Sequence, residues 1–145
     1  EVLGDELPAL RTFVTLSPIP GFAGWLRGRG ESLSDPADLP EGEGRRRELL
    51  AQAALYLGAT TARSGDPVAR FHLGNGAVIE RLNWKADMSD KAMRQSLGVM
   101  VNYRYDLEKL ERNRQAFENG GAAPASQEVR RLAQAARQSA AAPSP

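Results

Sequence analysis

The sequence predicts an α+β fold, in which a small β-sheet is flanked by helices. Two short segments, residues 12–17 and 99–105, are rich in β-branched and aromatic side chains, as strands are. Residues 45–58 instead carry apolar side chains at helical spacing. Because few segments have strand character and several have helix character, we expect one sheet with helices packed against it. A chain of 145 residues, 41% of them hydrophobic, is expected to form one domain with one core.

The first elements of the chain place a serine between a strand and two prolines. Residues 1–10 have the pattern of the last turns of an amphipathic helix. Residues 12–17, TFVTLS, predict a short buried strand that ends at Ser17. The two prolines that follow remove backbone donors and so end strand pairing. Residues 22–26 then predict a short helix.

A surface loop and two helices are predicted next. Residues 27–44 are rich in Gly, Ser, Asp and Pro, which is typical of a surface loop. In residues 45–58 the apolar side chains fall on one face of a helix. Asp66 is followed by a proline, a pattern typical of a helix start. We therefore expect residues 68–73 to form a short helix that carries His72.

Two more strands and a charged helix are predicted before the C-terminal region. Residues 77–84 alternate between apolar and polar side chains well enough for a strand. Residues 85–98 predict a turn and a short connection. In residues 99–105, VMVNYRY, alternate side chains share one face of a strand. Residues 106–118 predict a charged helix.

The C-terminal region is predicted to be a helix that follows a linker. Residues 119–125 predict the linker, and Ser126 is placed to cap a helix over residues 126–137. The Ala-, Ser- and Pro-rich residues 138–145 predict a disordered tail. Three strands are few for a self-contained sheet. We therefore expect residues 1–118 to be the C-terminal part of a domain whose other strands lie upstream.

Composition excludes several classes of function. The 19 basic and 18 acidic residues nearly balance, which gives no general case for a nucleic-acid partner. The chain has no cysteine, so disulfides and thiolate chemistry are excluded. Its single histidine cannot supply the imidazole pair that is usual in zinc and non-haem iron sites. No apolar run is long enough for a membrane span and no signal peptide is evident, so we expect no membrane partner and a cytoplasmic location.

The only imidazole and a conformationally restrained hydroxyl form the candidate site. His72 is the sole histidine, and Ser17 lies between an apolar strand and two prolines. Such a pair can transfer a proton without a metal. The hypothesis requires the fold to bring the two side chains into one cleft, within about 5 Å of each other.

Three sequence blocks carry a resemblance to a known family. They are SPIPGF at 17–22, FHLGNGAVIERLNWKAD at 71–87 and MVNYRY at 100–105. In this order they resemble the malonyl-CoA decarboxylase family. The resemblance runs from about residue 12 to residue 106 and excludes residues 27–63, which we expect to vary.

The resemblance implies a fold and a reaction. Family members hold coenzyme A in a splayed cleft of a GCN5-related N-acetyltransferase-like mixed sheet flanked by helices. Residues 1–118 would be the C-terminal portion of that catalytic domain. The reaction, a step of fatty acid metabolism, converts malonyl-CoA to acetyl-CoA and carbon dioxide with no metal or organic cofactor, since coenzyme A is part of the substrate. An N-terminal helical domain, which lies upstream in the family, implies a homo-oligomer, and the loop that cradles the coenzyme A phosphates lies upstream as well.

The resemblance also implies residue roles. His72 would donate a proton to C2 of the enolate, and Ser17 would bind substrate and act as the proton acceptor that partners His72. Tyr105 is a further candidate for the catalytic set. By residue type alone, Asn75 and Asn102 are candidates to bind substrate by donating to the thioester oxygen, although a turn and a strand face explain them equally well. Without the family, a packed imidazole near a helix end and a turn hydroxyl would explain His72 and Ser17 as well.

Two other functions stay open at this point. An acyl-CoA N-acyltransferase would use the same fold for amine acylation. A non-catalytic fragment, which needs the missing upstream half, is the other alternative. The serine and histidine together favour the decarboxylase, because amine acylation mainly requires a base.

Overall fold

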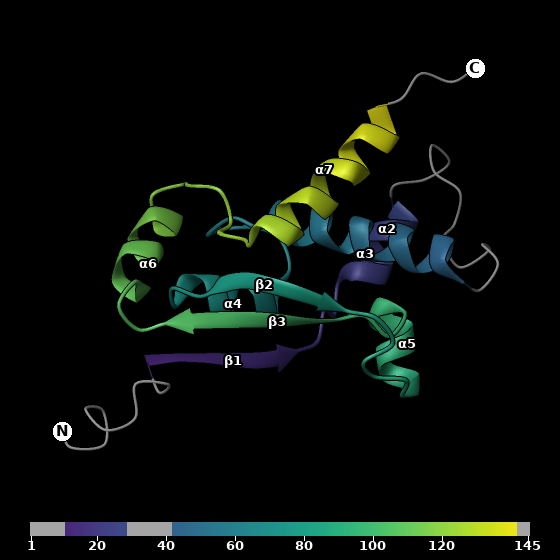
Figure 1. The fold of residues 1–145 in the computed structure, drawn as a ribbon, viewed down its shortest axis with the longest axis horizontal. Coiled ribbons are helices and arrows are strands. Elements are labelled where there is room, and N and C mark those ends of the chain that lie inside the picture. The colour runs from purple at the N-terminus through teal and green to yellow at the C-terminus, as the bar shows by residue number, and fades with distance from the viewer. Residues whose placement is uncertain (1–10, 29–41, 142–145) are drawn as a thin grey trace.

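The computed structural model describes residues 11–28 and 42–141. In chain order the elements are β1 (Thr12–Ser17), α2 (Phe22–Gly28), α3 (Glu43–Gly58), α4 (Pro67–Gly74), β2 (Val78–Asn83), α5 (Asp90–Ser96), β3 (Met100–Asp106), α6 (Leu110–Glu118) and α7 (Gln127–Ala141) (Figure 1). The predicted α+β class is confirmed. The helix predicted over residues 1–10 and most of the loop predicted over residues 27–44 lie outside the described residues.

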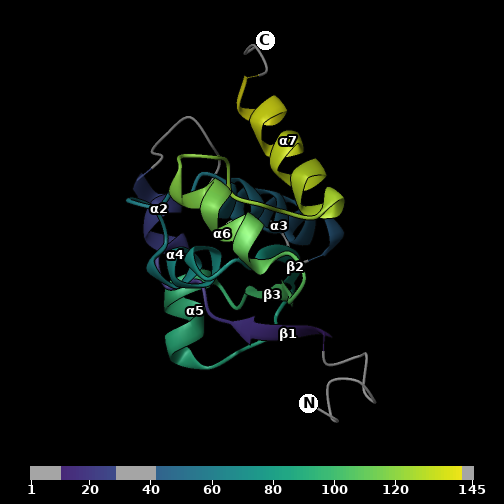
Figure 2. The same ribbon diagram turned by 90° about the vertical axis from the view of Figure 1, so that its left-hand side faces the viewer.

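The three strands form one antiparallel sheet in the order β1-β3-β2. Side chains alternate along β3 as predicted, because Val101, Tyr103 and Tyr105 are buried and the residues between them are only half-buried. The buried side chains point to the face that the helices cover, and Figure 2 shows α2, α3 and α4 gathered on one side of the strands. A single parallel bridge between Ile79 and Ala125 attaches the segment before α7 to β2.

The core lies between this face of the sheet and the helices. Helix α3 packs along α7 and also against β2. Val129, Ala133 and Ala136 of α7 are buried in this core and Leu132 is half-buried against it. As predicted, Ser126 caps the helix by accepting a hydrogen bond from the amide of Val129. The largest fully buried side chains are Tyr103, Phe22, Phe117, Ile19, Leu49, Leu57, Leu73 and Ile79, followed by smaller ones.

Strand β1 is not the buried strand that its composition predicts. Phe13, Val14 and Leu16 are 48%, 51% and 55% exposed, and Ser17 is the one buried residue of the strand. Val14 and Leu16 lie opposite Arg104 and Asn102, on the face of the sheet away from the buried side chains of β3. In addition, β1 pairs with β3 on one side and has no strand on its other side within the described part of the chain. A sequence of buried-strand type therefore lies at the edge of this sheet.

Three predictions differ from the structure: one helix was missed and the bounds of two others are wrong. Residues 85–98 contain helix α5, which Ser89 caps and which ends at Leu97 in the left-handed conformation. Helix α6 begins at Leu110, because Asp106 still belongs to β3 and a turn follows it. Helix α7 continues to Ala141, four residues beyond the predicted end at 137, since alanine has the highest helix propensity.

A glycine two residues after α4, Gly76, lies very close to the start of α6. Gly76 has a φ of +95°, and a Cβ at this position would lie 2.4 Å from the carbonyl oxygen of Leu110. We expect Gly76→Ala to lower the free energy of unfolding by at least about 2 kcal/mol, from the positive φ and the backbone clash together. Gly58→Ala is the control, because Gly58 is helical with no atom near its Cβ position, and the change should stabilise by up to about 1 kcal/mol. Denaturant unfolding measures both variants, and equal effects would contradict the packing described here.

Candidate active site

The end of a strand and the last turn of a helix bring the two predicted residues together. Ser17 is the last residue of β1, and His72 lies in the last turn of α4. The hydroxyl oxygen of Ser17 is 3.1 Å from Nε2 of His72, and both residues are buried. The predicted proximity is confirmed, although 55 positions separate the two residues in the chain.

Local sequence fixes the helix that carries His72. Asp66 is the N-cap of α4, and one carboxylate oxygen accepts hydrogen bonds from the amides of Val68 and Ala69. A proline occupies the first turn, where no intrahelical donor is needed. Ala69, His72 and Leu73 are the buried residues of α4, so the helix turns His72 toward the sheet.

Two tyrosines of β3 hold the other sides of the imidazole. The hydroxyl of Tyr105 is hydrogen-bonded to Nδ1 of His72. The ring of Tyr103 stacks on the imidazole, with the ring centroids 4.3 Å apart and the planes 18° from parallel. Tyr105 was predicted, and Tyr103 was not predicted as a site residue. Its position on the same face of β3, two residues before Tyr105, was the signal that could have identified it.

Burial sets the protonation of this cluster. It lowers the pKa of His72 below its ordinary value of 6.5, so the ring is neutral at neutral pH. It also raises the pKa of Tyr105, which therefore stays a neutral phenol. A neutral imidazole donates from one nitrogen and accepts at the other. Because the hydroxyls of Ser17 and Tyr105 each donate or accept, either tautomer of His72 is satisfied.

The surroundings of the pair are partly open. Thr15 contacts the hydroxyl of Ser17, with the two oxygens 3.4 Å apart. Phe13 is half exposed and stacks on Tyr105, with the centroids 4.8 Å apart. Phe71 is 65% exposed and meets the edge of the imidazole. A buried proton-transfer cluster thus lies directly beside exposed aromatic side chains on β1 and α4.

The other candidates have structural partners. Asn75 is exposed at the C-cap of α4, and its amide donates to the carbonyl oxygen of Phe71. Asn102 donates to the backbone of Thr15 and accepts from Asn83, so it ties β1, β2 and β3 together. In the described part of the chain, neither asparagine side chain is hydrogen-bonded to the side chain of Ser17 or His72.

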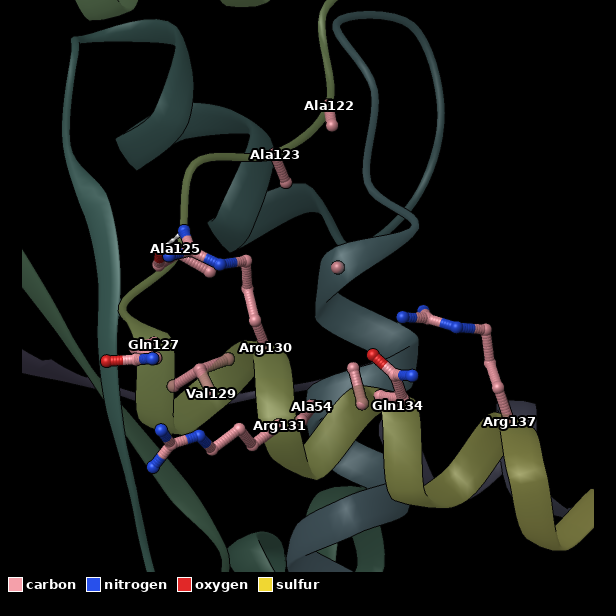
Figure 3. A pocket seen from close by; sticks show the side chains of 12 residues that line it. Ala54, Ala122, Ala123, Ala125, Gln127, Val129, Arg130, Arg131, Gln134 and Arg137 are labelled. Atoms are coloured by element: carbon pink, nitrogen blue, oxygen red, sulfur yellow. Dashed lines mark hydrogen bonds between the residues drawn. The ribbon is translucent and has the colours of Figure 1, made fainter.

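The cavity between α3 and α7 is separate from this cluster. It has a volume of about 420 Å³, and Figure 3 shows Arg130, Arg131 and Arg137 projecting from α7 around it. Ser17 and His72 do not line it. Within residues 11–28 and 42–141, no group of three His, Cys, Asp or Glu side chains could hold a metal ion. The described part of the chain thus brings a hydroxyl, an imidazole and a phenol together, groups that can exchange protons.

A family model matches nearly the whole chain, and curated relatives match about three quarters of it. The sequence profile of a family described as "Malonyl-CoA decarboxylase C-terminal domain" matches residues 1–43 and 37–143. The mitochondrial malonyl-CoA decarboxylase of Rattus norvegicus is 39% identical over 74% of this chain and 30% of its own length. That of Anser anser anser is 33% identical over 79% of this chain and 31% of its own length.

Solved structures agree with these sequence matches. The malonyl-CoA decarboxylase of Agrobacterium vitis has a TM-score of 0.75 and 44% identity, covering 90% of this chain and 38% of that chain. The enzyme of the same name from Cupriavidus metallidurans has a TM-score of 0.72 and 38% identity, covering 90% of this chain and 40% of that chain. The chain therefore spans well under half of the length of these relatives.

The lowered pKa of His72 predicts a pH-dependent contribution to stability. The unfolded chain protonates this ring at a higher pH than the folded chain, so the contribution is complete above about pH 7 and is lost as the pH falls through about 6.5 and below. We expect the Tm of the wild type to fall more than that of His72→Gln between about pH 7.5 and about pH 5.5. Thermal unfolding of both proteins in the same buffers measures this difference. Parallel decline of the two Tm values would contradict the buried, neutral ring.

Proposed function

The chain belongs to the malonyl-CoA decarboxylase family, and we propose that the protein converts malonyl-CoA to acetyl-CoA and carbon dioxide. The match covers nearly every residue of the chain and includes the three sequence blocks that resemble the family. The observation that carries the proposal is the contact between Ser17 and His72 beside exposed aromatic side chains. A proton donor at this position is what the reaction needs after carbon dioxide has left.

The chemistry requires an electron sink and then a proton. The bond between the carboxylate carbon and C2 breaks, carbon dioxide leaves, and the electron pair moves into the thioester carbonyl to give an enolate. The carboxylate must lose water for this step, and a partly buried site weakens its solvation. Delivery of a proton to C2 of the enolate then gives acetyl-CoA. Because the thioester carbonyl itself accepts the electron pair, we propose that no metal or organic cofactor takes part.

His72 is the proposed proton donor to C2. Its ring is held on three sides, by Ser17 at Nε2, by Tyr105 at Nδ1 and by Tyr103 on its face. A ring held in this way keeps its orientation while a proton passes through it. Ser17 binds the substrate carboxylate and accepts a hydrogen bond from protonated His72. The proton that C2 gains comes from His72, and the ring takes up one proton from water before the next turnover. Tyr105 stabilises the charge that His72 carries in the protonated state by accepting a hydrogen bond from Nδ1.

We propose that the rest of the substrate binds to a part of the protein upstream of this chain. The N-terminal amides of α4 are already used by Asp66, so this helix does not offer its amides to a pyrophosphate. The exposed edge of β1 is the place where an upstream strand would pair. Homo-oligomer formation through an N-terminal helical domain, and substrate binding by Asn75, stay predictions.

The expected cytoplasmic location is not part of the proposal. Curated relatives from rat and goose carry "mitochondrial" in their names, which weighs against it. Among the residues that the structure describes, no helix has the length and apolar character to cross a bilayer.

The first experiment separates the proposal from its alternatives. The full-length protein is incubated with malonyl-CoA and no amine, and carbon dioxide release is measured. Release supports the decarboxylase, whereas acyl transfer that needs an added amine would identify an N-acyltransferase of the same fold. Absence of both reactions in the full-length protein would favour a non-catalytic role.

Replacement of either member of the pair should reduce turnover. We expect His72→Asn and Ser17→Ala each to lower the rate of carbon dioxide release by about 100-fold or more, because a positioned acid–base group contributes about that much. Ser96→Ala is the matched control for Ser17→Ala. Ser96 is also buried and hydrogen-bonded, but only to the backbone around α5. Near-normal rates in His72→Asn, with circular dichroism unchanged, would refute the assignment.

Tyr105→Phe tests the hydrogen bond at Nδ1. The phenyl ring keeps the stacking with Phe13, so only the hydroxyl is lost. We expect kcat to fall by about 10- to 100-fold, because one hydrogen bond to a group that becomes charged is worth about 1.5–3 kcal/mol. Steady-state kinetics on malonyl-CoA measure the change. An unchanged kcat would show that Nδ1 needs no partner in the reaction.

A further inference from the structure

A fully buried carboxylate connects the two segments that carry the proposed proton-transfer pair. Asp66 is completely buried, and its two oxygens accept four hydrogen bonds. A buried carboxylate is tolerated only when its hydrogen-bonding capacity is used in this way. The donors come from three separate elements of the fold, which makes Asp66 more than a local helix cap.

The two carboxylate oxygens of Asp66 accept hydrogen bonds from different parts of the fold. Oδ2 accepts from the amides of Val68 and Ala69, at 3.1 Å each, and this alone caps α4. Oδ1 instead accepts from the amide of Gly21 at 3.1 Å and from the hydroxyl of Tyr56 at 3.2 Å. A helix cap does not require this second pair of bonds, so they call for another explanation.

The second oxygen reaches the segment that follows Ser17. Gly21 lies four residues after Ser17, just past the two prolines. The carboxylate that binds its amide, that of Asp66, lies 45 positions later in the sequence. The approach is close enough that a Cβ on Gly21 would lie 2.2 Å from the hydroxyl of Tyr56. Tyr56 belongs to α3, so the contact also joins this turn to the main helix of the core.

We infer that Asp66 is a positioning residue, which sets the distance between Ser17 and His72 by tying the turn after β1 to the start of α4. The inference rests on the proposed function for its effect on turnover. One carboxylate holds both chain segments: the backbone four residues after Ser17 and the helix that carries His72 six residues after the cap. Without these hydrogen bonds, β1 and α4 are free to shift relative to each other. A shift of about 1 Å can reduce the rate of a reaction by about 100-fold.

The neighbourhood of Asp66 also supports the imidazole ring. Burial, and after it the charge of Asp66, raise the pKa of Tyr103, so this phenol stays neutral. Tyr103 is the side chain that stacks on His72. Its hydroxyl is buried and has no hydrogen-bond partner among the described residues. The ring that stacks on His72 is therefore held by packing, within the electrostatic reach of Asp66.

Asp66→Asn separates the two roles. Asparagine is as good an N-cap as aspartate, so its oxygen can still cap α4. Its amide group then faces the N–H of Gly21, which is a donor and cannot accept. In the full-length protein we expect kcat for carbon dioxide release to fall by about 10- to 100-fold while KM changes by less than about twofold. A crystal structure of the variant should show the Ser17 oxygen and Nε2 of His72 farther apart than hydrogen-bond distance.

Two further variants complete the experiment. Tyr56→Phe keeps the cap and the bond to Gly21 and removes one donor, so a smaller fall in kcat, of about 3- to 10-fold, is expected. This variant decides the question if Asp66→Asn does not fold. Ser89→Ala is the control: it removes the cap of α5, a helix that carries none of the site, and should lower Tm without lowering kcat.

The outcomes distinguish this inference from the proposed function. A kcat within about twofold of the wild type in Asp66→Asn, or a fall no larger than in Ser89→Ala, overturns the positioning role. An unchanged contact between Ser17 and His72 in the crystal structure of Asp66→Asn overturns it as well. If the wild type releases no carbon dioxide, the proposed function fails, and the crystallographic distance still decides whether Asp66 positions the pair.

Discussion

The position of a single imidazole depends on a helix of eight residues, α4, whose first amides are held by a buried carboxylate. A helix this short has little stability of its own, because nucleation is costly and few bonds follow. Its direction is therefore set by what it contacts: Asp66 at its start, the core at Leu73, and the two tyrosines of β3 at His72. The geometry of the candidate site is a consequence of these contacts.

The sheet supplies the second requirement. Antiparallel pairing puts Ser17 opposite Val101, and Phe13 opposite Tyr105, so that odd-numbered residues of β1 share a face with the buried residues of β3. A shift of one residue in this register would turn Ser17 to the other face of the sheet, away from α4. Asn102 opposes such a shift, because its side chain bonds the backbone of Thr15 and also accepts from Asn83.

The amino-acid composition of β1 does not match its exposed environment. Phe13, Val14 and Leu16 are residues of buried-strand type that lie exposed at an edge. The chain spans less than half of its solved relatives, so the conflict is resolved if upstream sequence covers this edge. The cluster of Ser17, His72 and Tyr105 lies at this same border, because Phe13 stacks on Tyr105.

Local patterns were sufficient for most elements of the fold and for three of the site residues. Alternation identified the buried face of β3, the Asp-Pro pair identified the start of α4, and the family blocks identified Ser17, His72 and Tyr105. Each of these features depends on residues that are close together in the chain, so the sequence by itself determined them. The exposed edge of β1, the stacking of Tyr103 and the four bonds of Asp66 were decided only by the tertiary structure. Each depends on which distant segments pack together, and no short-range pattern records that.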